Sequence, residues 1–223
     1  MIRIHFLLCF FMLNLTLSVF SQQNDFVSWN YVSLNYKINE NWTASFSEHM
    51  MRNENATETW LFLHDLSISH RITRHFSHEL HLRLINQKRL NDQFEDREMI
   101  FYAINGRVNW YGWTLSARTR WQGLVFGTHF KDAYKGPYFY HRFRLGVGKS
   151  INYHWRTGLN AEIFQPLNRP QRAPFDQIRW GAGISYRFNK YLTVDQLFQI
   201  QKQFNRANPY TYYVWGLGCN FTW

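Results

Sequence analysis

Apolar and polar residues alternate one by one along most of the chain from residue 26 onward. An alternation with a period of two residues is typical of β-strands whose two faces meet different surroundings. The pattern predicts an all-β protein with eleven candidate strands, centred near residues 31, 46, 65, 82, 103, 118, 143, 159, 182, 197 and 217. In the clearest of them, Trp113, Leu115, Ala117, Thr119 and Trp121 oppose Thr114, Ser116, Arg118, Arg120 and Gln122.

The connections between these segments alternate in length. Short ones lie near residues 37–41, 71–75, 109–112, 150–153 and 189–190. Longer polar ones lie near residues 53–58, 91–96, 123–137, 165–175 and 204–211. Short turns at one rim and longer loops at the other are typical of a transmembrane β-barrel, and we expect all its strands to be antiparallel.

An aromatic residue follows each short connection. A membrane-interface girdle needs this placement, because amphipathic rings are most stable at the level of the lipid headgroups. The residues of this predicted girdle are Trp42, Phe76, Trp113, Trp155 and Tyr191. A second set recurs near the longer loops and predicts the opposite girdle: Trp60, Trp121, Tyr138, Phe164 and Tyr212.

The polar faces of the predicted strands carry many arginines. An arginine that faces lipid at mid-membrane costs about 2–4 kcal/mol, so in a barrel these side chains must point into the lumen. A soluble β-sandwich would satisfy the same alternation, but the recurring girdles and strands of at least the roughly 9–11 residues that cross a bilayer favour the barrel. The expected lumenal residues are Arg83, Arg118, Arg120, Arg142, Arg144, Arg179 and Arg187, with Glu79, Glu162 and Asp195 as counter-charges.

Composition narrows the class further. Aromatic residues make up 19% of the 223 residues, which excludes a disordered chain. Two cysteines cannot build a disulfide framework, and no later stretch approaches the roughly 18 consecutive apolar residues of a spanning helix. Residues 1–21 contain an apolar run from Phe6 to Val19 and predict a cleaved signal peptide, so we expect a barrel domain of residues 22–223.

The number of strands stays open between 10 and 12, because bacterial single-chain barrels have even numbers. Phe26 to Lys37 is either a closing strand or one member of an uncounted pair. The last segment combines alternating apolar residues with a final aromatic. It resembles the signal by which the barrel assembly machinery recognises outer-membrane barrels, carried here by Trp215, Leu217, Phe221 and Trp223.

The chain from residue 22 onward resembles the family of uncharacterised outer-membrane barrels known as domain of unknown function 2490. The likeness is carried by QNDFVSWNYVSLNYKINENWTASFSEHM, by the arginine-rich TLSARTRW and HRFRLGVG, and by FDQIRWGAGISYRFNKYLTVDQLFQIQ. The resemblance implies a location in the outer membrane of a Gram-negative bacterium. It implies no activity and no functional residue.

Two interpretations of the arginine-rich interior remain open. Like charges directly opposite one another destabilise a sheet, so these arginines need carboxylates, water or bound anions nearby. In a salt-bridged structural plug, carboxylates would neutralise the arginines. In a narrow anion-preferring channel, passing anions would do so, because rings of arginine select anions. A barrel of ten to twelve strands leaves at most a narrow passage, which favours the plug.

The alternative function is an outer-membrane hydrolase or acyltransferase acting on lipid or peptide. Such sites combine a nucleophile with a histidine base within hydrogen-bond reach. The candidate atoms belong to His49, His64, Asp65, Ser67 and Ser69, but no nucleophile motif frames them and we assign no catalytic residue.

We expect no cofactor and no metal site. His78 and His81 point to opposite faces of one predicted strand, whereas zinc needs convergent ligands. Nucleic acid is not expected as a partner either, because the arginines form no exposed basic helix. The expected protein is a monomer in contact with outer-membrane lipids.

Overall fold

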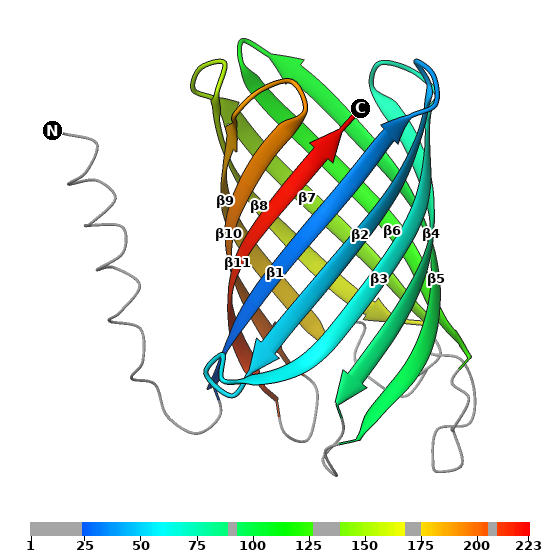
Figure 1. Ribbon diagram of the computed structural model, residues 1–223, viewed down its shortest axis with the longest axis vertical. Helices are drawn as coiled ribbons and strands as arrows, with labels where there is room; N and C mark the ends of the chain where they lie inside the picture. Colours follow the sequence, from blue (N-terminus) through cyan, green and yellow to red (C-terminus); the bar gives the residue numbers. More distant parts are fainter. Residues whose placement is uncertain (1–23, 89–92, 127–138, 168–174, 205–208) are drawn as a thin grey trace, which may run out of the picture.

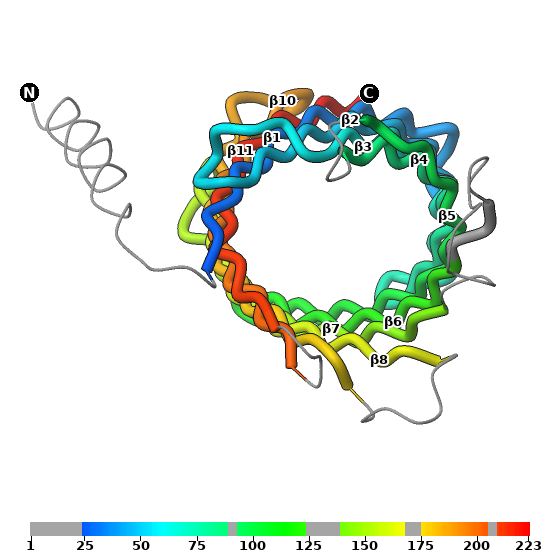
Figure 2. Tube along the Cα trace, turned by 90° about the horizontal axis from the view of Figure 1, so that it is seen from below, coloured from blue at the N-terminus to red at the C-terminus, as the bar shows by residue number. Residues whose placement is uncertain are grey.

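The computed structural model describes residues 24–88, 93–126, 139–167, 175–204 and 209–223, and the predicted signal peptide lies outside them. Within these ranges, eleven strands form one closed barrel (Figure 1, Figure 2). The prediction of an all-β barrel with 10 to 12 strands is confirmed. The strands are β1 (Asn24–Lys37), β2 (Trp42–Asn53), β3 (Glu58–Arg71), β4 (Phe76–Lys88), β5 (Phe94–Trp110), β6 (Trp113–Phe126), β7 (Phe139–Ser150), β8 (Trp155–Pro166), β9 (Gln177–Arg187), β10 (Leu192–Gln203) and β11 (Thr211–Thr222). Among the described residues, no helix combines the length and the apolar character that crossing a bilayer requires.

The barrel closes through a parallel pair of strands. β1 and β11 run in the same direction, with Tyr31 opposite Gly218 (Figure 1). The other neighbouring pairs are antiparallel. An odd number of strands joined by hairpins leaves the first and last strands pointing the same way, so they can meet only in parallel. Phe26 to Lys37 is therefore the closing strand, and the expectation of a wholly antiparallel barrel is wrong at this seam.

The connections differ between the two rims of the barrel. Five short turns lie at one rim, called here the short-turn rim, and the strand ends that flank the other connections form the opposite, long-loop rim (Figure 1). The connection between β2 and β3 spans only residues 54–57, so the expectation of a longer loop near residues 53–58 is wrong. In three short turns the side chains of Asn39, Asn152 and Asn189 accept two backbone N–H groups each, at 2.8–2.9 Å. The β5–β6 turn instead places Tyr111 and Gly112 at φ values of 44° and 76°, as a two-residue hairpin turn requires.

Apolar side chains cover the outer face of the barrel. Leu80, Leu82 and Leu84 alternate along β4 and are all exposed, whereas Phe101 and Ala103 of the neighbouring strand are buried inside. The five residues of the predicted first girdle follow the short turns directly: Phe76, Trp113, Trp155 and Tyr191 are exposed, and Trp42 stacks on His70 with ring centroids 4.3 Å apart.

The second predicted girdle differs from the structure. Phe164 is only 6% exposed and lies inside the barrel, because its position alternates with the outer residues of β8. Trp60 and Tyr212 stack on each other, with ring centroids 6.4 Å apart, and both line an internal cavity. Trp121 is exposed on the outer face, and Tyr138 lies outside the described residues.

Candidate functional site

A single buried carboxylate inside the barrel binds three arginines. Glu162 of β8 is 2% exposed. Its Oε1 accepts a hydrogen bond from Arg118 Nη2, and its Oε2 accepts one from Arg142 Nη2, both at 2.7 Å. Arg179 Nη1 lies 3.8 Å from Oε2. Guanidinium groups from β6, β7 and β9 thus converge on one carboxylate of β8. Glu162 is the counter-charge for all three arginines.

A second group lies on the neighbouring wall. Asp65 Oδ2 accepts hydrogen bonds from the Nε of Arg83, at 2.7 Å, and from its Nη2. His81 Nδ1 lies 2.7 Å from Asp65 Oδ1, and its Nε2 lies 3.3 Å from Glu79 Oε2. The His81 ring stacks on Phe101 with centroids 4.1 Å apart. Asp65 therefore serves as the counter-charge that Arg83 needs, although the sequence suggested it only as a candidate catalytic atom.

Two further arginines have no carboxylate within ion-pair distance among the described residues. Arg120 is 7% exposed, and its guanidinium lies over the Phe101 ring, 4.1 Å from the centroid. Arg144 lies directly opposite Arg118 across β6 and β7, and Arg120 lies directly opposite Arg142. The Nε atoms of Arg118, Arg120 and Arg142 are buried without a hydrogen-bond partner. These four arginines form an under-neutralised cationic group at the centre of the barrel.

We call the six arginines of these groups the central arginine cluster. Among the described residues, the carboxylates beside it are those of Asp65, Glu79 and Glu162. The members of the cluster are Arg83, Arg118, Arg120, Arg142, Arg144 and Arg179. At the ε of about 20 that suits protein sites, unit charges 4 Å apart interact by about 4 kcal/mol, so such an excess favours a bound anion.

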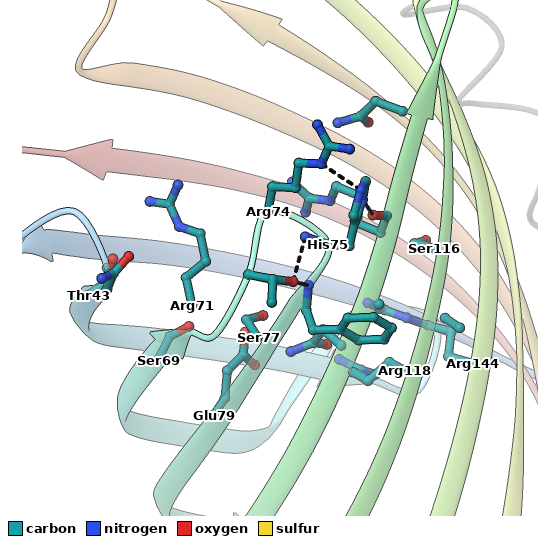
Figure 3. A pocket seen from close by; sticks show the side chains of 18 residues that line it. Thr43, Ser69, Arg71, Arg74, His75, Ser77, Glu79, Ser116, Arg118 and Arg144 are labelled. Atoms are coloured by element: carbon teal, nitrogen blue, oxygen red, sulfur yellow. Dashed lines mark hydrogen bonds between the residues drawn. The ribbon is translucent and has the colours of Figure 1, made fainter.

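Arginines of the cluster line two cavities. The first, the short-turn chamber, has a volume of about 550 Å³ and includes Arg71, Arg74 and Glu79 in its lining (Figure 3). The second, the long-loop chamber, has a volume of about 540 Å³ and is lined by all six arginines of the cluster. Arg118 and Arg144 line both chambers. These two guanidinium groups therefore lie at the boundary between the chambers.

Two predicted lumenal residues lie apart from the cluster. Asp195 accepts hydrogen bonds from Tyr31 Oη at 3.0 Å and from Asn220 Nδ2 at 2.5 Å, and no ion pair to it is found among the described residues. It therefore stabilises the closing seam, and its role as a lumenal counter-charge stays a prediction. Arg187, at the end of β9 on the short-turn rim, lies 5.5 Å from the centroid of the Tyr153 ring.

The residues of the predicted assembly signal lie along β11 and just beyond it. Trp215, Leu217 and Phe221 share the outer face of the strand, and Leu217 is exposed. Trp223 is exposed as well and stacks on Phe221 with ring centroids 6.0 Å apart. The side chains thus form an apolar strip at the seam.

The suggested hydrolase residues do not converge. His64 lies on the outer face, 2.5 Å from Glu48 Oε2, whereas His49 accepts a hydrogen bond from Trp29 Nε1 inside the barrel. Ser69 lines the short-turn chamber, and Ser67 shares the inward face of β3 with Asp65. The described residues contain no cluster of three or more His, Cys, Asp or Glu that could hold a metal ion.

A different polar group on the outer face was not found from the sequence. His141 Nε2 lies 2.7 Å from Thr119 Oγ1, and His141 Nδ1 lies 3.4 Å from Gln165 Oε1. Trp121 flanks the imidazole with ring centroids 5.3 Å apart. The three residues of this polar group come from β6, β7 and β8. Only the register between these strands could have indicated that Thr119, His141 and Gln165 meet.

These features define a closed, porin-like β-barrel with a charged interior. The chain belongs to the family described as "Protein of unknown function (DUF2490)", which it matches over residues 26–212. The family resemblance stated from the sequence is thereby confirmed.

Several solved barrels are similar in structure. The NanC porin in a rhombohedral crystal form has a TM-score of 0.51 and 9% identity, over 79% of this chain and 86% of that chain. The anion-selective porin from Comamonas acidovorans has a TM-score of 0.40 and 11% identity, over 82% and 54% respectively. The translocator domain of the autotransporter NalP from Neisseria meningitidis has a TM-score of 0.40 and 15% identity, over 78% and 71%. No curated protein matches the chain significantly in sequence.

Proposed function

We propose that this protein is an outer-membrane β-barrel of a Gram-negative bacterium whose lumen forms a narrow, anion-preferring passage. The main support for this proposal is the central arginine cluster, in which six buried or half-buried arginines face three carboxylates. A plug would be expected to balance its charges, because an unpaired buried charge is costly. Arg120 and Arg144 instead have no carboxylate within ion-pair distance among the described residues, and a passing anion would compensate them.

The proposed setting follows the usual arrangement of such barrels. Residues 1–21 direct export and are removed, and the remaining chain inserts with its short-turn rim toward the periplasm. The assembly machinery recognises Trp215, Leu217, Phe221 and Trp223, and the mature barrel is a monomer surrounded by outer-membrane lipids. The exposed apolar outer face and the aromatic girdle support this setting.

Planar-bilayer recordings across a potassium chloride gradient test the passage. The proposal predicts a small conductance whose reversal potential has the sign of chloride selectivity. Replacing both Arg120 and Arg144 with glutamine removes the uncompensated charges, so the anion preference should fall. Arg52→Gln is the matched control, because Arg52 is exposed on the outer face of β2 and its loss should leave the selectivity unchanged. A barrel that is silent or cation-selective would overturn the proposal.

Hydrolysis or acyl transfer at a lipid ester is a second candidate function, favoured by the Thr119–His141–Gln165 group. With Gln165 Oε1 as acceptor, His141 carries its proton on Nδ1 and accepts the Thr119 hydroxyl proton at Nε2. His141 and Gln165 lie near the long-loop ends of β7 and β8. On the outer face this places the group near a membrane interface, the depth at which lipid ester bonds lie.

The chemistry of this candidate is nucleophilic acyl transfer. The Thr119 oxygen would attack the ester carbonyl while its proton passes to His141 Nε2 and then to the departing alkoxide, and water would release the acyl group from threonine. Refolded barrel in vesicles with a fluorogenic lipid ester tests it. Activity should disappear in Thr119→Ala and persist in Thr157→Ala, a threonine on the same face near the short-turn rim. Absence of turnover, or turnover that survives Thr119→Ala, would eliminate the candidate.

A further inference from the structure

Arginines continue from the central cluster to the short-turn rim. Arg71, Arg74 and Arg107 line the short-turn chamber together with Arg118 and Arg144 (Figure 3). Glu79 is the only carboxylate among the described residues that line this chamber. The Arg71 guanidinium donates to the backbone oxygen of Glu40, and Arg74 Nε donates to the neighbouring imidazole. The cationic excess therefore extends over the whole chamber.

The long-loop chamber also has more arginines than carboxylates in its lining, although Arg83 and Arg97 form ion pairs with Asp65 and Glu95. Seven arginines line it, and Glu162 is the only carboxylate among its described lining residues. The arginines of this chamber are Arg83, Arg97, Arg118, Arg120, Arg142, Arg144 and Arg179. Since Arg118 and Arg144 belong to both chambers, the two cationic linings form one continuous path.

Along β6 and β7, the arginines of this path are regularly spaced. Arg118 and Arg120 on β6 are two residues apart, as are Arg144 and Arg142 on β7, which corresponds to steps of about 7 Å along the strands. Arg107 and Arg97 lie ten positions apart on β5, about 33 Å along that strand. We call the series Arg71, Arg107, Arg118, Arg144, Arg120 and Arg142 the arginine ladder.

We infer that the arginine ladder binds an elongated polyanion, a linear chain bearing several phosphate or carboxylate groups. This inference rests on the proposed function and names the class of solute. Both groups match the planar fork of a guanidinium, which donates two parallel hydrogen bonds to either. A single small anion neutralises the charge of one arginine, or rung, of the ladder. A linked series compensates several rungs while losing its translational freedom only once, so its affinity rises with the number of charges.

Binding is measured by calorimetric titration of the refolded barrel in neutral detergent, with orthophosphate, tripolyphosphate and a hexaglutamate peptide as probes at equal ionic strength. Tripolyphosphate should bind at least about tenfold more tightly than orthophosphate. Comparing tripolyphosphate with hexaglutamate shows whether phosphate or carboxylate chains are preferred. Equal affinity for orthophosphate, tripolyphosphate and hexaglutamate would overturn the inference.

Two ladder variants and one control sharpen the test. Arg144→Gln removes the rung shared by the two chambers and should weaken tripolyphosphate binding about tenfold. Arg107→Gln removes a rung near the short-turn rim, outside the central cluster, and should weaken tripolyphosphate binding by a smaller factor. Arg52→Gln should change neither affinity. Tripolyphosphate binding that resists both ladder substitutions would place the ligand elsewhere and overturn the inference.

The outcome is separable from that of the proposed passage, because binding in detergent does not require conduction. A barrel that binds tripolyphosphate through the ladder and carries no anion current would overturn the passage and retain the ladder. A barrel that conducts chloride and does not distinguish tripolyphosphate from orthophosphate would retain the passage and overturn the ladder.

Discussion

Glu162 holds together more charge than any other described side chain in the barrel. It binds Arg118 and Arg142 at 2.7 Å and lies 3.8 Å from Arg179, at 2% exposure. Removing one partner of a buried ion pair costs about 3–5 kcal/mol, because the other charge stays buried without compensation. We therefore expect Glu162→Gln to lower the free energy of unfolding by about that amount in urea titrations of the lipid-reconstituted barrel.

Glu58→Gln provides the matched control for this substitution. Glu58 forms an ion pair with Lys88 at 2.8 Å, but its side chain is 45% exposed. Exposed pairs contribute about 0–1 kcal/mol, so the control should unfold nearly as wild type does. Equal losses in the two variants would contradict the role given to Glu162.

Arg120 should behave in the opposite way. It lies opposite Arg142 and has no carboxylate within ion-pair distance among the described residues, so its charge opposes folding. Arg120→Met keeps much of the contact with Phe101 while removing the charge. Replacing buried charges with apolar side chains is often neutral or stabilising by about 1–4 kcal/mol. The variant should therefore unfold at a higher urea concentration than wild type, and a clear loss of stability would contradict the account of an uncompensated charge.

Several contacts of the site could be predicted from the sequence, and others could not. Alternation alone assigns Arg118 and Arg120 to one face of a strand. The short turn between β7 and β8 sets the register of these two strands and places Glu162 directly opposite Arg144. The short turn between β3 and β4 likewise places Asp65 opposite Arg83, so the sequence alone could have indicated this pair. The register between β6 and β7 depends on a long connection, so the facing arginines and the Thr119–His141 contact had no local signal.

At the scale of the strands, the closing seam is the feature that the hydrophobic pattern left open. The alternation locates the segment from Phe26 to Lys37, but it contains no information on which strand pairs with it. The parallel pairing of β1 with β11 follows from the odd strand count, which became known only with the closed barrel.

Tyr31 and Gly218 provide the test of this seam. A Cβ atom on Gly218 would lie 2.0 Å from the Tyr31 ring, so any side chain there displaces the ring and its hydrogen bond to Asp195. Gly218→Ala should therefore destabilise the barrel by about 1–3 kcal/mol, as overpacking commonly does. In the Tyr31→Ala background the same substitution should cost little. A full cost in both backgrounds, measured by urea unfolding, would show that the two residues do not meet across the seam.

For the whole molecule, the account depends on which face of each strand meets lipid. The apolar outer face and the girdle of Trp42, Phe76, Trp113, Trp155 and Tyr191 fit a bilayer, and the arginines line internal chambers. Neighbouring residues on one strand should then experience different surroundings. Leu159 of β8 is exposed on the outer face, whereas Asn160 lines the long-loop chamber.

Fluorescence quenching of single cysteines in vesicles tests this assignment most directly. Cys219→Ser gives a barrel domain without cysteine, into which Leu159→Cys and Asn160→Cys are introduced separately. Brominated lipid should quench a dye on residue 159 and leave a dye on residue 160 bright, while a charged, water-soluble thiol reagent should modify only residue 160. Quenching at residue 160 with aqueous access at residue 159, or no difference between the two, would contradict a barrel that faces lipid with its apolar side.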